Sequence, residues 1–83
     1  MSTIGTLLQE NNFMSNDISK RFAERLCKLR KEHGYSQEKF AEVCDLHRTY
    51  VGKLERLERN PTLPVLDRIA RALDMELWEL LKM

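Results

Sequence analysis

Residues Tyr35 to Glu58 read YSQEKFAEVCDLHRTYVGKLERLE, and this stretch decides the fold. It predicts two short helices separated by a tight turn. The first runs from about residue 37 to residue 43, and Ser36 before it is a suitable N-cap. Asp45 falls at the turn, where aspartate tolerates a left-handed backbone better than most residues other than glycine. Leu46 is expected to fill the gap between the two helices.

The second helix, from about residue 47 to residue 57, has two faces of different chemistry. At about 100° per residue, Val51, Leu54 and Glu55 point to one side. The opposite side carries hydrogen-bond donors and a glycine, with Tyr50 at the border: Arg48, Thr49, Gly52, Lys53 and Arg56. Such donors suit the base edges and phosphates of DNA. A glycine in the middle of a helix lowers its stability by about 1 kcal/mol relative to alanine. Such a residue is expected where the helix backbone must lie close to another surface. The alternative is an ordinary solvated face.

Three further helices are expected, and no segment has the alternating pattern of a strand. The first spans about residues 18–33, ends at Gly34, and has an apolar face made of Ile18, Phe22, Leu26, Leu29 and His33. Another follows Asn60-Pro61, with Thr62 as its N-cap and an inner face made of Leu66, Ile69, Ala70 and Leu73. The last runs from about residue 75 to residue 82. The sequence therefore predicts an all-α, compact five-helix bundle.

Length and charge fit one small domain. The chain has 83 residues, enough for a single core, and its formal net charge of +1 argues against binding polyanions through bulk charge. The charge is uneven, because residues 20–32 hold six Lys or Arg against two Glu, and residues 48–59 hold four against two. A basic patch on a near-neutral body suits sequence-selective binding. For Lys20, Arg21 and Arg25, a solvated helical surface is an equal alternative.

Arg30 and Glu55 lie on the packed faces of two different helices. Arg30 follows Leu26 by four residues, and Glu55 follows Val51 by four. Opposite charges on two packed faces predict a partly buried ion pair, with two independent side chains reaching solvent as the alternative. We expect the pair to orient the second helix more than to stabilise the fold, because desolvation can cancel the attraction.

The end of the chain is too apolar for one stripe that faces the core. Six large apolar residues crowd the last nine positions: Met75, Leu77, Trp78, Leu80, Leu81 and Met83. Some can cap the core, and the rest need a cover. A second copy of the chain would supply it, which predicts a homodimer interface at Leu77, Trp78, Leu80 and Leu81. Replacing Leu77 and Leu80 by charged residues is then expected to give a folded monomer. The alternative is a C-terminal helix packed wholly on its own domain.

Other chemistry is sparse. Cys27 and Cys44 form no CxxC pair, and two histidines do not complete a zinc pattern, so we expect no metal and no cofactor. No nucleophile motif or paired-carboxylate arrangement indicates an enzyme, and no apolar run is long enough for a membrane. Residues 15–83 are expected to form the domain. Residues 1–14 are an extension, either a short helix or a disordered tail.

From about Leu29 to Leu81 the chain resembles the helix-turn-helix domains of phage repressors and their bacterial relatives, the Cro/C1 or XRE type. The resemblance rests on LRKEHGYSQEKFAEVC, DLHRTYVGKLERLERNPTL and VLDRIARALDMELWELL. The segment HRTYVGKLER is most similar to the controller proteins of restriction–modification systems, which are small dimeric regulators. The resemblance implies a lambda-repressor-like fold, and a regulator that binds a double-stranded operator as a homodimer.

The resemblance also implies roles for single residues. Ser36 presents amide groups suited to a phosphate, and Gln37 matches a phosphate contact. Five residues match recognition-helix positions that reach bases or nearby phosphates: His47, Arg48, Thr49, Tyr50 and Lys53. Three match flanking backbone contacts: Arg56, Asn60 and Thr62. His47 has helix capping as an alternative role. Two residues depart from the family pattern, because Asp45 stands where Gly or Asn is usual and Leu57 stands where Gly often ends the recognition helix.

Two functions remain open from the sequence. The first is a dimeric transcriptional regulator in the bacterial or phage-infected cytoplasm, repressing or activating its own operon, with RNA polymerase as a further partner. The second is an antitoxin-type module whose apolar surface masks a toxin while its fold binds DNA as an autorepressor. The sequence favours the first, since nothing follows the last helix that could wrap a toxin. The operator sequence and the sign of regulation do not follow from these residues.

Overall fold

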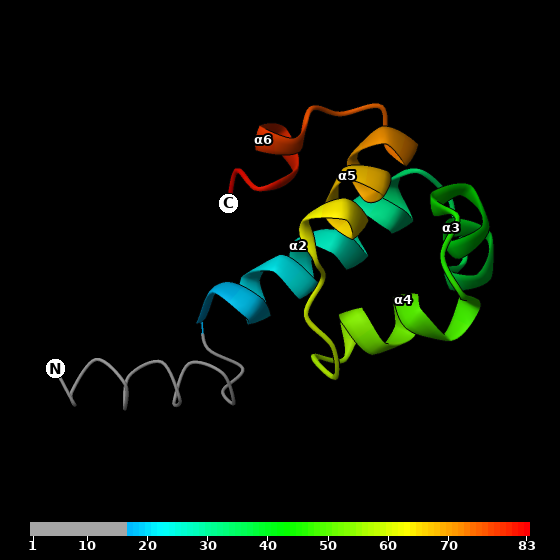
Figure 1. Cartoon of the computed structure of the whole chain (residues 1–83), viewed down its shortest axis with the longest axis horizontal. Helices are drawn as coiled ribbons and strands as arrows, with labels where there is room; N and C mark the ends of the chain where they lie inside the picture. Colours follow the sequence, from blue (N-terminus) through cyan, green and yellow to red (C-terminus); the bar gives the residue numbers. More distant parts are fainter. Residues whose placement is uncertain (1–16) are drawn as a thin grey trace, which may run out of the picture.

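The computed structural model describes residues 17–83 of the chain. Within this range there are five α-helices and no strand: α2 (Asp17–Glu32), α3 (Gln37–Cys44), α4 (Arg48–Glu55), α5 (Leu63–Ala72) and α6 (Leu77–Leu80). Figure 1 shows α3 and α4 at one end of the molecule and α6 beside the C-terminus. The helix α5 packs against α3 and α6. The expected all-α bundle is confirmed, and the expected extension over residues 1–14 lies outside the described residues.

The inner face of α2 is shorter than the sequence pattern predicts. Phe22, Leu26 and Leu29 are buried as expected. Ile18 is 58% exposed and His33 is also exposed, so placing both in the core was wrong. Both lie at the ends of the helix, beyond the elements that cover its middle. His33 instead stacks on Tyr35, with ring centroids 6.0 Å apart, in the turn that follows the helix.

Four helices end at a residue in the left-handed conformation. These residues are Gly34, Asp45, Leu57 and Asp74, with φ values of 75°, 60°, 66° and 57°. After each of them the next amide donates back to a carbonyl five residues earlier, as in Tyr35 to Arg30 at 3.1 Å and Glu58 to Lys53 at 2.8 Å. This pattern satisfies the free carbonyl groups at a helix end. The expectation for Gly34 and Asp45 is confirmed, and Leu57 ends α4 in the same way without being a glycine.

The core lies where α2, α3, α4 and α5 meet. Leu26, Phe40, Val51 and Ile69 have no exposed surface, and each comes from a different helix. The predicted inner face of α5 is confirmed, because Leu66, Ile69, Ala70 and Leu73 are all buried. Leu46 packs against this core from the turn between α3 and α4. Because α3 and α4 are only eight residues long, their position depends on this packing more than on helix propensity.

The last helix is shorter than expected. We predicted a helix over about residues 75–82, but α6 covers only Leu77–Leu80. Asp74 holds the chain in the left-handed conformation, and a capping box between Glu76 and Glu79 starts the new helix. Arg25 of α2 holds this segment in place, since its guanidinium donates to the carbonyl oxygens of Leu80 at 2.8 Å and Glu79 at 2.7 Å.

Candidate nucleic-acid interface

A shallow depression of about 260 Å³ lies between α3 and α4. Its lining comes from the first turn of α3 and from the solvent side of α4: Gln37, Glu38, Arg48, Thr49, Gly52 and Arg56. Five of these six residues belong to the candidate DNA-binding face or its glycine. Glu38 was not singled out from the sequence, and its position ten residues before Arg48 gives no local spacing that could have indicated it.

Side-chain caps set the start of both helices. Ser36 Oγ accepts the amide of Lys39 at 3.0 Å, which fixes the first turn of α3. His47 Nδ1 accepts the amide of Thr49 at 3.2 Å and lies 2.9 Å from the Thr49 hydroxyl. Of its two expected roles, His47 therefore takes the capping role in this structure. The helix α4 starts one residue later than expected, at Arg48.

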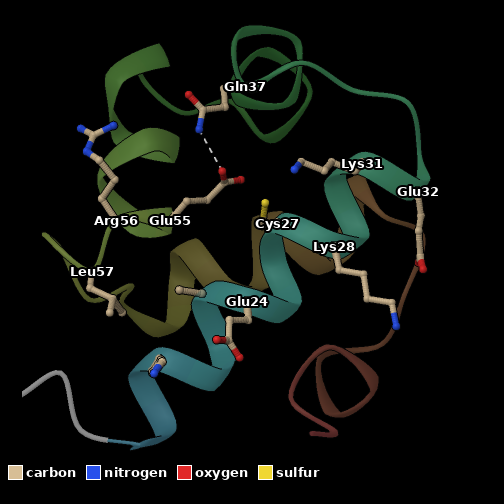
Figure 2. A pocket seen from close by; sticks show the side chains of 11 residues that line it. Glu24, Cys27, Lys28, Lys31, Glu32, Gln37, Glu55, Arg56 and Leu57 are labelled. Carbon is tan, nitrogen blue, oxygen red and sulfur yellow. Dashed lines mark hydrogen bonds between the residues drawn. The ribbon is translucent and has the colours of Figure 1, made fainter.

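A buried network joins α2, α3 and α4. Arg30 Nε donates to Glu55 Oε2 at 2.7 Å, and a second guanidinium nitrogen donates to Oε1 at 3.1 Å. Gln37 Nε2 donates to the same Oε1 at 2.8 Å, as the dashed line in Figure 2 shows. Arg30 also donates to the Tyr35 carbonyl oxygen at 2.8 Å. The Arg30 and Glu55 side chains are only 10% and 8% exposed, so the pair is the partly buried one expected from the sequence.

Both members of this pair remain charged. Burial opposes ionisation of the Glu55 carboxyl, but hydrogen bonds from Arg30 and Gln37 outweigh it and hold the pKa of Glu55 below its ordinary value. The hydrogen bond to Glu55 raises the pKa of Arg30 against the opposing effect of burial. Because Gln37 shares the Glu55 carboxylate, its amide is held in a fixed orientation at the edge of the depression.

Gly52 makes room for two side chains of the protein itself. A Cβ at this position would stand 2.8 Å from Arg56 Nη1 and 3.4 Å from Gln37 Oε1. Gly52 is also buried, although it faces the depression. The close approach that a mid-helix glycine indicated is therefore present, and in the free protein it is made by Arg56 and Gln37.

Two arginines at this surface have carboxylate partners. Arg48 lies 3.3 Å from Glu38, and Arg56 lies 2.8 Å from Glu58. The hydrogen bond to Glu58 raises the pKa of Arg56, and the same bond lowers the pKa of Glu58. All four side chains are at least half exposed, so these pairs contribute little to stability. In this structure they hold the two guanidinium groups at the edge of the depression.

The remaining candidate DNA-binding residues lie outside the depression. Tyr50 is half-buried and packs against the core, and Lys53 is half-buried on α4. Asn60 is exposed in the loop after α4, where it accepts a hydrogen bond from Ser19 at 3.5 Å. Thr62 caps α5 by accepting the amide of Val65 at 3.4 Å. The structure thus brings together Gln37, Arg48, Thr49 and Arg56 and leaves the others around them.

The pattern of the Helix-turn-helix family matches residues 26–80, which hold four of the five helices and the end of α2. The chain belongs to the helix-turn-helix family. In the terms of this family, α3 and α4 are the two helices of the motif, and α4 is the recognition helix. The resemblance stated from the sequence is confirmed.

Characterised relatives share this helix-turn-helix over most of their length. Control protein C.MunI of Mycoplasma sp is 47% identical over 66 residues, which cover 78% of this chain and 89% of that protein. Control protein C.SmaI of Serratia marcescens is 45% identical over 65 residues, 78% of this chain and 77% of that protein.

Solved structures of relatives have the same arrangement of helices. The restriction–modification controller protein C.AhdI from Aeromonas hydrophila matches with a TM-score of 0.71 and 44% identity, over 75% of this chain and 94% of that one. SinR, a master regulator for biofilm formation solved in complex with DNA, matches with a TM-score of 0.67 and 32% identity. This match covers 74% of this chain and 98% of the SinR chain.

Only part of the basic patch expected on α2 is exposed beside the helix-turn-helix. Arg25 binds carbonyl oxygens of the C-terminal segment, and Arg21 pairs with Asp17 at 3.1 Å and donates to the Met83 carbonyl oxygen at 3.2 Å. Arg30 is buried. The three arginines of residues 20–32 are therefore used inside the domain, whereas Lys20, Lys28 and Lys31 are exposed and line the groove beside Gln37 and Arg56. Figure 2 shows Lys28 and Lys31 on the rim of an open groove of about 890 Å³ that reaches Gln37, Glu55 and Arg56.

The residues expected at a dimer interface differ in exposure. Trp78 is 65% exposed and Leu81 39% exposed, whereas Leu77 is half-buried against the core. Leu80 has no exposed surface, so assigning it to an interface was wrong. The helix α6 is only one turn long, so one of its residues is buried in the core, and that residue is Leu80. A charged residue at Leu80 would disrupt the core rather than yield a folded monomer.

A second region of exposed apolar side chains surrounds a groove of about 280 Å³. Ile18, Leu57, Leu81 and Met83 line it, and each is at least 37% exposed. The groove joins the start of α2, the end of α4 and the C-terminal segment. We call this region the Leu81 face. The sequence pattern did not indicate it, because its members come from three separate parts of the chain.

Within residues 17–83 no group of His, Cys, Asp and Glu side chains could hold a metal ion. The helices of the same range include none that is long and apolar enough to cross a membrane. Cys44 is buried in the core and Cys27 is partly exposed beside Arg30, with Sγ 3.8 Å from a guanidinium nitrogen. Burial raises the pKa of the Cys44 thiol to about 11.

Proposed function

We propose that the protein is a sequence-specific, double-stranded DNA-binding transcriptional regulator that acts as a homodimer on an operator. The depression between α3 and α4 supports this function most directly. It gathers two arginines, a threonine and a glutamine on the exposed side of a helix-turn-helix. These side chains supply the donors that read base edges and hold phosphates in the major groove.

Each side chain has a distinct role in this proposal. Arg48 and Thr49 lie at the start of α4, the part of a recognition helix that reaches base edges. Gln37 and the amides behind Ser36 bind a phosphate at the start of α3, and Arg56 binds a flanking one. His47, Tyr50, Lys53, Asn60 and Thr62 complete the contact surface around them. The Arg30–Glu55 pair orients α4, because it links the back of that helix to α2.

The relatives narrow the biological role. C.MunI and C.SmaI are control proteins by name, and C.AhdI is a restriction–modification controller protein. We therefore propose that this chain controls the operon of a restriction–modification system in the bacterial cytoplasm, including its own gene. RNA polymerase is a further proposed partner. Genes for a restriction endonuclease and a methyltransferase beside its own gene would support this role, and a toxin gene there would support an antitoxin instead.

We propose the Leu81 face as the dimer interface, within a domain that spans residues 15–83. A helix of four residues is about 6 Å long, so α6 alone is too small for a stable interface. The Leu81 face adds surface from the start of α2 and the end of α4. A twofold contact beside the end of α4 leaves the depression free and places two recognition helices side by side for two half-sites.

The test is selection of duplexes from a random pool, followed by titration of the selected and a random duplex. We expect half-sites about 10 base pairs apart, or a multiple of that. With about four phosphate contacts per subunit, the log–log salt slope is expected near −7. Equal affinity for selected and random duplexes would refute sequence-specific binding.

Arg48 is the residue proposed to read a base. Arg48→Ala is expected to cost about 1–3 kcal/mol per half-site on the selected duplex and to relax the preference at one base position. Gln37→Ala is expected to weaken binding to all sequences similarly, because a phosphate contact carries no sequence information. If Arg48→Ala lowers specific and non-specific affinity by the same factor, Arg48 reads no base.

A further inference from the structure

Glu38 is the one acid among the six residues that line the depression between α3 and α4. We propose that Glu38 determines specificity by holding Arg48, so that Arg48 is released to a matching base and not to an arbitrary phosphate. This inference rests on the proposed function and assigns a role to a residue that makes no favourable contact with DNA itself.

The geometry places Glu38 as a partner of Arg48 across the motif. Glu38 is the second residue of α3 and Arg48 the first of α4, and their Oε2 and Nη1 atoms lie 3.3 Å apart. The two side chains are 75% and 72% exposed, so both remain accessible to a ligand. An acid has no evident packing role at this position, because Glu38 is exposed to solvent.

The effect of this carboxylate depends on what the DNA offers Arg48. A guanine presents two acceptors, O6 and N7, that bind the guanidinium bidentately and compete well with the carboxylate. A non-matching site offers a single phosphate contact, which gains less because Arg48 must leave Glu38 to make it. Glu38 also repels the phosphates that come near it. Non-specific binding therefore loses more than specific binding does.

The size of the effect follows from the exposure of the pair. An exposed ion pair of this kind changes an affinity by about two- to five-fold per subunit. A dimer carries two such pairs, so their effects multiply. The Arg56–Glu58 pair differs, because Arg56 is proposed to bind a phosphate on every sequence. Glu58 is therefore expected to lower the affinity for all DNA sequences alike.

The experiment compares Glu38→Gln with two matched variants, Glu42→Gln and Glu58→Gln. Glu42 lies one turn further along α3 and pairs with Lys39 at 3.0 Å, away from Arg48. Each variant removes one exposed negative charge. Affinities for the selected and the random duplex are measured at several salt concentrations, with thermal unfolding as a check on folding.

Glu38→Gln is expected to raise the affinity for the random duplex about two- to five-fold per subunit. The affinity for the selected duplex is expected to change less, so the ratio of selected to random affinity falls. The non-specific salt slope is expected to steepen by about 0.9 per subunit, one further phosphate contact each. Glu58→Gln is expected to raise both affinities equally, and Glu42→Gln to change both only slightly.

Two results would overturn the inference. If Glu38→Gln and Glu42→Gln raise both affinities by the same factor, Glu38 acts only through net charge. If Glu38→Gln lowers the affinity for the selected duplex and leaves the affinity for the random duplex unchanged, Glu38 contacts a base itself. The affinities of the wild-type protein for both duplexes are measured first. If these two affinities are equal, the proposed function is refuted, and not the role of Glu38.

Discussion

At the scale of single residues, Glu55 connects stability with the arrangement of the candidate DNA-binding surface. Its carboxylate accepts hydrogen bonds from Arg30 and Gln37, which lie on the two neighbouring helices. The desolvation cost of burying such a pair can equal its attraction, so its value lies in where it holds α4. Removing one partner is different, because it leaves the other charge buried and unpaired.

Glu55→Gln is therefore expected to lower the free energy of unfolding by about 3 kcal/mol. Denaturant titration measures this change, with Glu42→Gln as the control, because the exposed Lys39–Glu42 pair is worth less than about 1 kcal/mol. A loss below about 1 kcal/mol for Glu55→Gln would show that Arg30 finds another partner.

The same pair has a pH signature. Because the folded state holds the pKa of Glu55 below its ordinary value, the stabilisation is present above that ordinary value and is lost as the pH falls through the lowered one. Glu55→Gln lacks this part of the acid dependence. The difference between the unfolding free energies of wild type and variant is therefore expected to shrink as the pH falls below about 4.

At the scale of elements, the end of α4 is the least favourable of the four left-handed helix ends. Glycine adopts this conformation without cost, and aspartate tolerates it, whereas Leu57 has no such advantage. Leu57 also lines the Leu81 face. In the proposed dimer an apolar side chain at this position adds to the interface, and this contribution would offset the strain of the left-handed backbone at Leu57.

Comparing Leu57→Gly with Leu57→Ala separates these two effects. Both variants lose the apolar side chain, but only alanine keeps a Cβ in the left-handed conformation. The glycine variant is expected to be about 1 kcal/mol more stable than the alanine variant. Both are expected to weaken dimerisation equally. Alanine as stable as glycine in urea titrations would mean that residue 57 does not hold this conformation in solution.

The helix-turn-helix itself could be predicted from sequence because its signals are local. Ser36, Asp45 and the inward pair of Val51 and Leu54 each act within one or two turns, and all take their expected places. The end of the chain could not be predicted so well. The length of α6 depends on a capping box and on carbonyl contacts with Arg25, which lies more than fifty residues away.

At the scale of the whole molecule, the proposed dimer interface is made of side chains that no single helix carries. The sequence indicated surplus apolar residues near the C-terminus but not which of them face inward. Leu80 completes the core, while Leu81 turns toward residues from the start of α2 and the end of α4. The candidate site shows the same limit, since Arg48 of α4 is paired with a carboxylate ten residues earlier, Glu38 of α3.

Leu81→Glu is expected to raise the dimer dissociation constant at least about ten-fold and to leave the monomer folded, because the residue is partly exposed and a charge there opposes burial against a second copy. Sedimentation over a range of micromolar concentrations measures this change. Trp78→Glu is the comparison, since Trp78 does not line the groove. If only the Trp78 variant dissociates, the interface lies on the exposed side of α6 and not at the Leu81 face.

Because Cys44 is buried, chemical labelling of its thiol can report how often the native domain opens. Only the thiolate reacts quickly with alkylating reagents, and with a pKa of about 11 very little thiolate exists in the folded protein at pH 8. Its sulfur is also shielded, because Cys44 is 2% exposed. In a Cys27→Ala background, labelling of Cys44 therefore waits for the domain to unfold. The labelling rate reports native-state opening without denaturant, and a bound operator should slow it in proportion to its occupancy.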